Sequence, residues 1–282
     1  MTFDEFILNA RVAGFEDIEA VRKLAREAVL LQPQGSGSNG SFGSRVGGLP
    51  WLPPSLPWPQ RDGRSMAFIA QVDLGSQPRT AAAQGFPREG LLLFFYDIER
   101  SQWGYDPKHA GGFAVIHVPN PGTAKVVERP RDLADEAYFG ACGLASELTV
   151  TIPPPESVVV EDLNLSNEQR DAYFDLHSRV SGDDWAKRAL LAGYPDQIQG
   201  DMTLECEMVS SGLYCGNASA YSDPRMPSFR KHAPEWRLLL QVPSFSQAGM
   251  MWGDDGCLYY WIREDDLKAR RFERSWMILQ CF

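Results

Sequence analysis

The sequence is poor in the residues that build metal and redox sites. It has 5 cysteines and 4 histidines in 282 residues. No two cysteines stand in C-x-x-C spacing and there is no H-E-x-x-H pair, so a dedicated zinc site is not expected. The cysteines are odd in number and far apart, which predicts free thiols in a reducing cytosol. We therefore expect no metal and no other cofactor.

Common catalytic and nucleotide-binding motifs are also missing. There is no G-x-x-x-x-G-K-[ST] loop and no G-x-S-x-G elbow. Residues 35–40 match G-x-G-x-x-G, but a dinucleotide site needs a strand before the glycines and a helix after them, and here a predicted helix comes before them. Cys142 and Cys215 could be nucleophiles beside a converging histidine. Neither has a recognisable local context, and a small buried side chain is the simpler interpretation.

Long apolar runs and an excess of positive charge are absent too. No stretch approaches the roughly 18 apolar residues of a membrane span, and the N-terminal segment lacks the basic start and apolar core of a secretory signal. The 27 Lys and Arg residues are outnumbered by 37 Asp and Glu, for a net charge of −10. This acidic balance argues against a nucleic-acid partner. We expect a cytoplasmic protein with no membrane or nucleic-acid partner.

Helical patterns occur at the N-terminus and in the second half. Residues 2–31 are predicted to be helical with a break at Gly14, because Thr2 and Glu5 fit a capping box and apolar residues then recur at helical spacing. Further helices are expected over 167–180, over 183–192 and, more weakly, over 131–140. The first 31 residues therefore form an expected N-terminal helical segment.

Residues 32–65 form a long irregular segment rich first in Gly and Ser, then in Pro and Trp. A plain linker would lack apolar groups, whereas this segment carries several that we expect to be buried. We interpret it as an extended strap laid over the body of the protein, stiffened by its prolines. Its apolar residues are Phe42, Val46, Leu49, Trp51, Leu52, Leu56 and Trp58.

The remainder of the chain is dominated by strand patterns rich in aromatic and β-branched residues. These strands come in runs with helices between them, which favours an α+β fold with a largely antiparallel β core over a doubly wound sheet. The candidates are MAFIAQVDL, GLLLFFYDI, FAVIHV, SVVVE, TLECEMV, WRLLLQV, CLYYWI and SWMILQC.

One pattern recurs in both halves of the chain. A Gly-x-Pro tripeptide precedes an apolar strand that ends in Gln-Val, and a Gly then opens an aromatic strand. The first copy runs through Gln71 and the second through Gln241. We interpret this as an internal duplication, so residues 32–282 are predicted to be one domain of two similar halves, about 42–160 and 190–282.

The two glutamines allow two interpretations. A buried amide must find hydrogen-bond partners, so Gln71 and Gln241 either satisfy backbone groups where the halves meet or line a shared cleft. The Gly253–Gly256 segment also allows two interpretations. It is either a hairpin turn between Met250–Trp252 and Cys257–Ile262, or it carries a pair of carboxylates, Asp254 and Asp255, that act as metal ligands or as acid and base.

The chain also resembles a known family. The blocks Arg45-Val46-Gly47-Gly48-Leu49-Pro50, Met66-Ala67-Phe68-Ile69-Ala70-Gln71 and Trp252-Gly253-Asp254-Asp255-Gly256 resemble the YwqG-like family, a bacterial domain of unknown function. Further matching blocks are Gly193-Tyr194-Pro195 and Trp236-Arg237-Leu238-Leu239-Leu240-Gln241. The resemblance covers most of residues 42–282. It implies a cytoplasmic α+β domain with a duplicated core and brings no catalytic residue or cofactor.

Three functions are compatible with these patterns. The first is a non-catalytic binding module that holds a small molecule or peptide in a cleft between the halves, since 11% of the residues are aromatic and pockets combine aromatic with a few polar groups. Arg45 would neutralise an anion, the glutamines would orient the ligand and Trp252 would stack on it. The expected ligand-binding residues are Arg45, Gln71, Asp73, Gln241, Trp252 and Asp254.

The two alternatives belong to other classes. An acidic protein can oppose a basic toxin or enzyme by charge complementarity, which would make the chain an immunity-type partner with the N-terminal helices as its specificity surface. A hydrolase would use Asp73, Asp97, Asp254 or Asp255 as acid and base. The sequence contains no constellation that commits it to catalysis, and it gives no oligomeric state.

Overall fold

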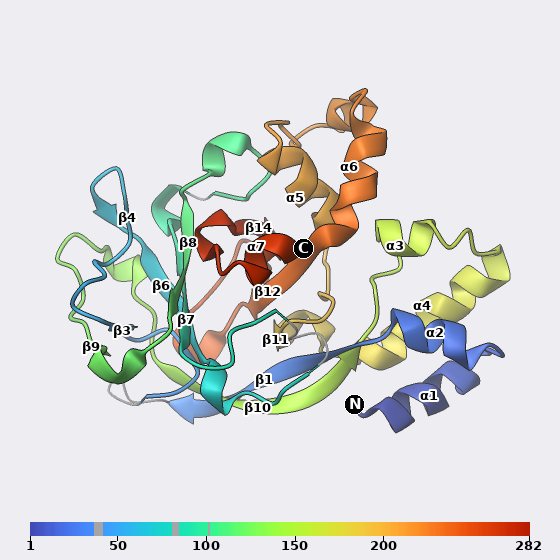
Figure 1. The fold of residues 1–282 in the computed structure, drawn as a ribbon, viewed down its shortest axis with the longest axis horizontal. Coiled ribbons are helices and arrows are strands. Elements are labelled where there is room, and N and C mark those ends of the chain that lie inside the picture. The colour runs from blue at the N-terminus through green and yellow to red at the C-terminus, as the bar shows by residue number, and fades with distance from the viewer. Residues whose placement is uncertain (37–41, 81–84, 101) are drawn as a thin grey trace.

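The computed structural model describes residues 1–36, 42–80, 85–100 and 102–282. It is an α+β protein in which seven helices of the described residues surround one large antiparallel sheet (Figure 1). The helices are α1 (Phe3–Val12), α2 (Ile18–Leu24), α3 (Val158–Glu161), α4 (Asn167–Ser181), α5 (Met202–Ser210), α6 (Met226–His232) and α7 (Glu264–Lys268).

The main sheet has ten strands in the order β14-β13-β12-β11-β1-β10-β2-β6-β7-β8, and every neighbouring pair is antiparallel. The pair β1 and β10 lies at its centre. The strands are β1 (Arg26–Ser36), β2 (Arg45–Val46), β6 (Ala67–Asp73), β7 (Leu91–Tyr96), β8 (Phe113–Val118), β10 (Cys142–Thr151), β11 (Ala189–Leu191), β12 (Trp236–Pro243), β13 (Cys257–Arg263) and β14 (Trp276–Gln280).

The sheet curves so strongly that its two ends face each other across the core. The ring centroids of Phe94 on β7 and Tyr260 on β13 are 5.0 Å apart, and those of Phe113 on β8 and Trp276 on β14 are 5.3 Å apart. Aromatic pairs at these separations are favourable beyond the area that they bury. The space between the two ends is therefore filled by side chains of the main hydrophobic core.

Six of the predicted strands are confirmed as β6, β7, β8, β12, β13 and β14. Both faces of β7 and β13 are covered, which explains why their sequences are nearly continuous apolar runs rather than alternating patterns. The predicted helix over 167–180 is confirmed as α4, with Ser166 and Gln169 forming the expected capping box.

The helix predicted over 2–31 ends early. It is divided into α1 and α2, and the residues from Arg26 onward form β1 instead. In this segment the apolar spacing fits a helix as well as a strand. Pairing decides the outcome, because β1 bonds to β10 on one side and to β11 on the other, and Ala28, Val29 and Leu31 are buried there.

Four smaller predictions are also wrong. SVVVE contains the short helix α3, and TLECEMV lies in α5, where Met202, Cys206 and Val209 recur at helical spacing against the core. The predicted helix over 183–192 is a 3-10 turn followed by β11, and that over 131–140 shrinks to a 3-10 turn. Short apolar runs do not distinguish helix from strand by periodicity alone.

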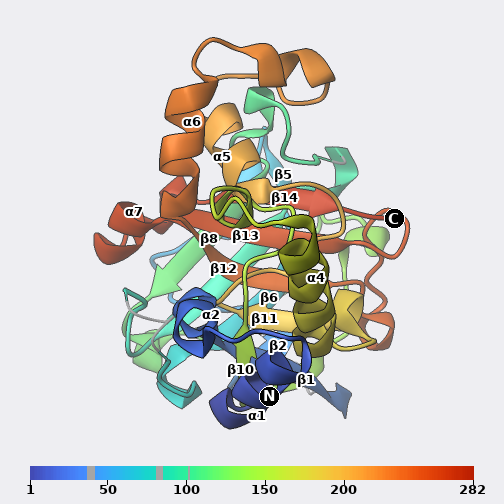
Figure 2. The same cartoon turned by 90° about the vertical axis from the view of Figure 1, so that its right-hand side faces the viewer.

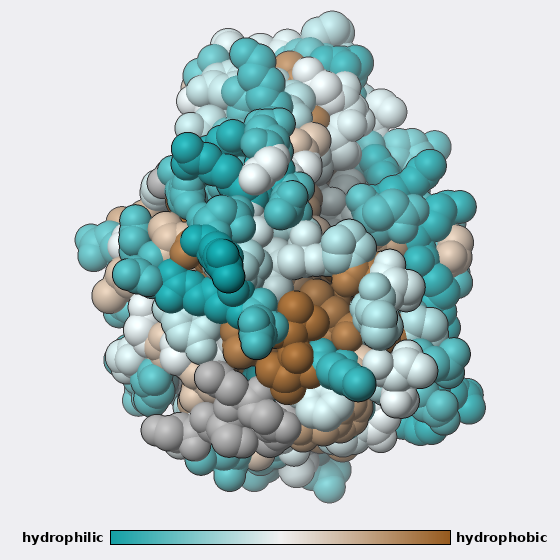
Figure 3. All heavy atoms as spheres, turned by 90° about the vertical axis from the view of Figure 1, so that its left-hand side faces the viewer, coloured by the Kyte–Doolittle hydropathy of each residue, from teal (hydrophilic) through white to brown (hydrophobic). Residues whose placement is uncertain are grey.

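The strap contains the short strands β3 (Trp51–Leu52), β4 (Gln60–Arg61) and β5 (Arg64–Ser65), and β3 pairs with β9 (Lys125–Val126). Val46, Leu52 and Trp58 are buried as expected. Phe42 is not, since 47% of it is exposed. Figure 3 views the side on which β3, β4 and β9 lie, and apolar residues gather near the middle of that face.

The helices lie in two groups outside the sheet. Helices α1, α2 and α4 form one layer beside the ends of β1 and β10, and α5 and α6 form a second layer beside β12 and β14 (Figures 1 and 2). Phe6, Val21 and Tyr173 belong to the separate apolar cluster under the first layer. Within the described residues, no helix has the length and apolar character that crossing a membrane requires.

Candidate functional site

Gln71 is fully buried on β6 and holds the strap in place. Its amide nitrogen donates to the carbonyl of Gly43 at 3.0 Å, and its Oε1 accepts from the backbone N–H of Trp51 at 3.1 Å. Arg45 is its neighbour on β2, and the Arg45 guanidinium donates to the carbonyl of Leu49. Burial lowers the pKa of Arg45 to about 10.

Gln241 on β12 is equally buried and forms corresponding hydrogen bonds on the other arm of the sheet. Its amide nitrogen donates to the carbonyl of Arg188 at 2.9 Å, and its Oε1 accepts from the backbone N–H of Asp196 at 2.8 Å. The Asp196 carboxylate is also buried and forms an ion pair with Arg188 at 2.5 Å. Both glutamines therefore satisfy backbone groups on the two sides of the short strand next to them, β2 for Gln71 and β11 for Gln241.

More of the backbone pattern recurs between the two ends of the sheet. A bulge interrupts the pairing of β6 with β7 between Phe68 and Ala70. A bulge at the corresponding place interrupts the pairing of β12 with β13 between Leu238 and Leu240. The same positions then form matching backbone hydrogen bonds in both halves. The bond from Gly47 N to Ile69 O, at 2.8 Å, matches the bond from Ala192 N to Leu239 O, at 3.4 Å. The bond from Leu74 N to Gly90 O, at 2.9 Å, matches the bond from Ser244 N to Gly256 O, at 3.0 Å.

The other sequence-predicted ligand residues have structural positions of their own. Asp73 ends β6, where its carboxylate caps the turn at Gly75. Trp252 is buried against Tyr96, and its indole N–H donates to the carbonyl of Pro243 at 3.0 Å. Asp254 is exposed in the turn before β13. The role of these residues in ligand binding stays a prediction.

The carboxylates suggested for a hydrolase do not form one cluster. Asp73 and Asp97 lie at opposite ends of the β6–β7 pair, about 20 Å apart at 3.3 Å per residue. Burial raises the pKa of Asp97, while Arg100 and Arg61 oppose that rise. Asp255 is exposed with Asp254 in a turn, as predicted. The predicted β-hairpin is wrong, because Met250–Trp252 forms no strand and β13 pairs with β12 and β14 instead. No three His, Cys, Asp or Glu side chains gather as metal ligands in the part of the chain that the structure describes.

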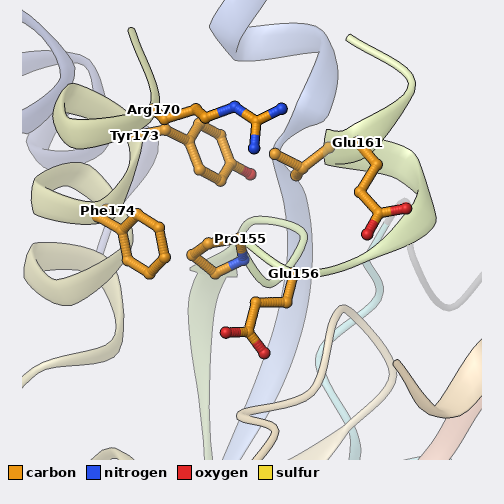
Figure 4. Close-up of a pocket in the computed structure, with 7 residues that line it drawn as sticks. Pro155, Glu156, Glu161, Arg170, Tyr173 and Phe174 are labelled. Atoms are coloured by element: carbon orange, nitrogen blue, oxygen red, sulfur yellow. The ribbon is translucent and has the colours of Figure 1, made fainter. Parts of the chain in front are cut away.

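Surface hollows occur mainly around the helical layers. One of about 250 Å³ lies between α3 and α4 and is lined by Pro155, Glu161, Arg170 and Phe174 (Figure 4). Glu161 pairs with Arg230 and the Arg170 Nε donates to a backbone carbonyl, whereas Glu156 forms no ion pair with a described residue. No buried side-chain polar atom lacks a hydrogen-bond partner among the described residues that line this hollow.

A smaller hollow of about 30 Å³ differs in this respect, and we call it the Arg26 pocket. It lies where the start of β1, the β10–α3 loop, the loop after β11, the N-terminus of α5 and strands β12 and β13 meet. The residues that line it are Arg26, Pro154, Ser157, Val159, Gly193, Tyr194, Pro195, Gln197, Asp201, Met202, Thr203, Pro234, Trp236, Arg237 and Trp261.

Two polar side chains of this pocket are buried without a hydrogen-bond partner. Ser157 is 6% exposed and Trp261 is 2% exposed. The Oγ of Ser157 and the Nε1 of Trp261 make no hydrogen bond to any described residue. An indole N–H can only donate, and a buried donor without an acceptor costs about 1–3 kcal/mol. Two such atoms in one pocket indicate a group that is able to accept from both.

Arg26 adds a positive charge at the same place. Its guanidinium lies 4.2 Å from the ring centroid of Tyr194 and forms no ion pair with a carboxylate of the described residues. Burial lowers the pKa of Arg26 and raises that of Tyr194. An arginine stacked on a ring keeps its N–H groups available in the ring plane for an acceptor.

The remaining charged groups of the pocket are engaged elsewhere. Asp201 accepts from the backbone N–H of Val158 at 2.6 Å and caps α5 through Thr203 at 2.6 Å. Arg237 pairs with Glu264. The pocket therefore presents one available cation and two unpaired buried groups, an arrangement that suits the oxygen atoms of a carboxylate. Its volume holds such a head group or one water molecule.

Comparison with known proteins identifies the family. A protein-family model described as "Domain of unknown function (DUF1963)" matches residues 44–281, most of the chain. The chain belongs to the DUF1963 family. No curated protein matches it. The match to DUF1963 begins just before β2 and ends after β14, so it leaves out α1, α2 and the central strand β1.

The sequence alone does not predict the Arg26 pocket, although two of its segments carry recognisable patterns. Gly193-Tyr194-Pro195 and Trp236-Arg237 were recognised as repeat or family blocks, and both line the pocket. Ser157 and Trp261 lie in apolar segments that the sequence analysis predicts only as strands. Arg26 lies outside the DUF1963 match, and nothing in its local sequence signals that it would stack on Tyr194.

Proposed function

We propose that this DUF1963 protein is a non-catalytic binding module whose Arg26 pocket receives the carboxylate end of a small molecule or peptide. One observation carries the proposal. Ser157 Oγ and Trp261 Nε1 are buried without partners, and both residues line the same pocket as Arg26, which has no carboxylate partner among the described residues. A bound carboxylate would accept from all three groups.

The charge of Arg26 favours a carboxylate over a neutral ligand. Charge-assisted hydrogen bonds are roughly twice as strong as neutral ones, and a guanidinium fits the two oxygens of a carboxylate. The volume of about 30 Å³ admits only the head of such a ligand. The rest would lie outward, over the half-buried side chains of Arg26 and Tyr194.

We also propose the duplication, with halves of about 42–160 and 190–282. The paired roles of Gln71 and Gln241 support it. In this division Ser157 comes from the first half, Trp261 from the second and Arg26 from the N-terminal segment. The pocket then corresponds to the expected cleft between halves. We further propose that the domain is YwqG-like and that the protein is bacterial and cytoplasmic.

The test is a titration of ¹⁵N-labelled protein with sodium acetate, with acetamide as the neutral probe of similar size. The readout is the indole N–H resonance of Trp261, assigned with Trp261→Phe. We expect acetate to shift this resonance downfield saturably, because a new acceptor forms on Nε1, and acetamide to shift it far less. Arg26→Gln should weaken the acetate response at least tenfold, and the exposed control Arg22→Gln should leave it unchanged.

The titration also has clear contrary outcomes. An unchanged Trp261 resonance in acetate, or equal responses to acetate and acetamide, would mean that the pocket holds only water. If acetate instead acted on residues around Arg45 and Gln71, the predicted ligand-binding residues would be favoured over the Arg26 pocket.

A further inference from the structure

A second hollow lies in the helical layer at the N-terminal end, away from the Arg26 pocket. It has a volume of about 600 Å³ and lies between α2 and the start of α4, so we call it the α2–α4 groove. The residues that line it are Gly14, Phe15, Glu16, Asp17, Ala20, Val21, Leu24, Leu163, Leu165, Glu168, Gln169, Ala172 and Tyr173.

The floor of the groove is apolar and partly open to solvent. Phe15 and Tyr173 meet edge to face with their ring centroids 6.5 Å apart, and Val21 and Leu24 extend the apolar surface. Leu163 in the loop before α4 is 41% exposed. The exposed part of Leu163 is continuous with the apolar lining of the groove, and contiguous apolar surface of this kind is typical of an interaction site.

The rim of the groove carries charge of one sign. Glu16, Asp17 and Glu168 line it, and no Lys, Arg or His is among the described lining residues. None of the three carboxylates forms an ion pair within the described part of the chain. Arg170 is the nearest cation along α4, but it lines the separate hollow between α3 and α4 shown in Figure 4.

This surface also combines two parts of the chain. The α2 side lies before residue 44, outside the DUF1963 match, and the α4 side lies inside it. A groove built partly from a segment outside the family match gives this chain a surface that the family pattern does not specify.

We propose that the α2–α4 groove docks a basic amphipathic peptide segment of another protein. An apolar side chain of the segment would enter between Phe15, Leu163 and Tyr173, and its Lys or Arg residues would face the acidic rim. Complementary charge of this kind accelerates encounter and excludes acidic competitors. The inference is independent of the Arg26 pocket and stands whether or not that pocket binds a carboxylate.

The test is selection from a phage-displayed library of random 16-residue peptides against the full chain at low salt. We expect the enriched peptides to combine Lys or Arg with large apolar residues, and to lose affinity steeply as salt rises. Ala20→Trp, which fills the groove, should weaken the binding of a selected peptide at least tenfold. Glu16→Gln and Glu168→Gln should each weaken it about three- to tenfold.

The control is Glu19→Gln, on the same helix but outside the groove, which should leave the affinity within about twofold. Circular dichroism melts would show that each variant is folded. Enriched peptides without basic residues, no enrichment at all, or equal binding to the Ala20→Trp variant would each overturn the proposal.

Discussion

Gln71 and Gln241 each bind one carbonyl and one N–H that flank the neighbouring short strand, with the same two amide atoms, on opposite arms of one curved sheet. Both side chains are fully buried. Each therefore ties the two flanks of a neighbouring strand together through one amide, and the two positions make a matched pair for mutation.

We predict that Gln71→Leu and Gln241→Leu each lower the free energy of unfolding by about 2–4 kcal/mol, because each removes the side-chain partner of one backbone carbonyl and one backbone N–H. The measurement is urea denaturation followed by tryptophan fluorescence. Gln32→Leu serves as control, since Gln32 is exposed on β1, and should change stability by less than about 0.5 kcal/mol. A cost below 1 kcal/mol at both buried positions would mean that these backbone groups find other partners.

Gly193 is a second position where the fold leaves no room. Its φ of 77° lies in the left-handed region, and an added Cβ would stand 2.6 Å from both the Cβ of Ala28 and the Oγ1 of Thr151. Gly182 has a φ of 73° but nothing within 4 Å of such a Cβ. We expect Gly182→Ala to cost about 2 kcal/mol from backbone strain alone, because its ψ of 177° lies in a region that is almost restricted to glycine, and Gly193→Ala to cost roughly 2 kcal/mol more because of its two close contacts. Equal losses in melting temperature for the two variants would contradict this difference.

Glu205 on α5 predicts a pH dependence of stability. Burial, and then the nearby Asp201, raises the pKa of Glu205 to about 7. Since the unfolded chain has the lower pKa, this group favours folding below about pH 4.5, and its contribution is lost as the pH rises through about 7. Glu205→Gln should therefore match the parent at pH 4 and exceed its stability at pH 8 by on the order of 2 kcal/mol, allowing for partial exposure.

The measurement is a series of urea midpoints from pH 4 to pH 8 for both proteins. Only the difference between them isolates Glu205, because other carboxylates titrate in the same range. Two curves that stay parallel across this range would show that Glu205 is ionised at an ordinary pKa in the folded protein.

The boundary of the DUF1963 match leads to a prediction about truncation. A fragment that starts at residue 38 keeps the whole matched region but lacks β1, and so divides the sheet between β10 and β11. We expect this fragment to show no cooperative thermal transition. A fragment that starts at Ala25 keeps β1 and should keep a cooperative, though lower, transition. A cooperative melt of the shorter fragment would show that the two arms of the sheet fold without their central strand.

The sequence predicts the arms of the sheet better than its centre. The strands β6, β7, β12 and β13 are found because they are covered on both faces and carry unbroken apolar and aromatic runs. Strand β10 has a stretch of partly exposed residues, so it shows neither alternation nor an apolar run. The tertiary pairing of β1 overrides its helical spacing.

The candidate site was harder to predict for a different reason. The Arg26 pocket is lined by side chains from six segments of the chain. No spacing in the sequence indicates that Ser157 and Trp261 line the same pocket. Gln71 and Gln241 were identifiable because a repeated pattern marked them. Buried polar atoms without hydrogen-bond partners, by contrast, can be recognised only in the folded structure, where the positions of all possible partners are known.

The position of β1 also has a consequence for synthesis on the ribosome. Arg26 pairs with Thr151 on β10, and Val29 pairs with Leu191 on β11. At about 5–20 residues per second, β1 leaves the ribosome roughly 10–30 s before β11 is made. Both edges of β1 stay unpaired until β10 is made, and the edge that pairs with β11 stays open until that later strand emerges. An open strand edge of this kind is a site of mispairing in the nascent chain.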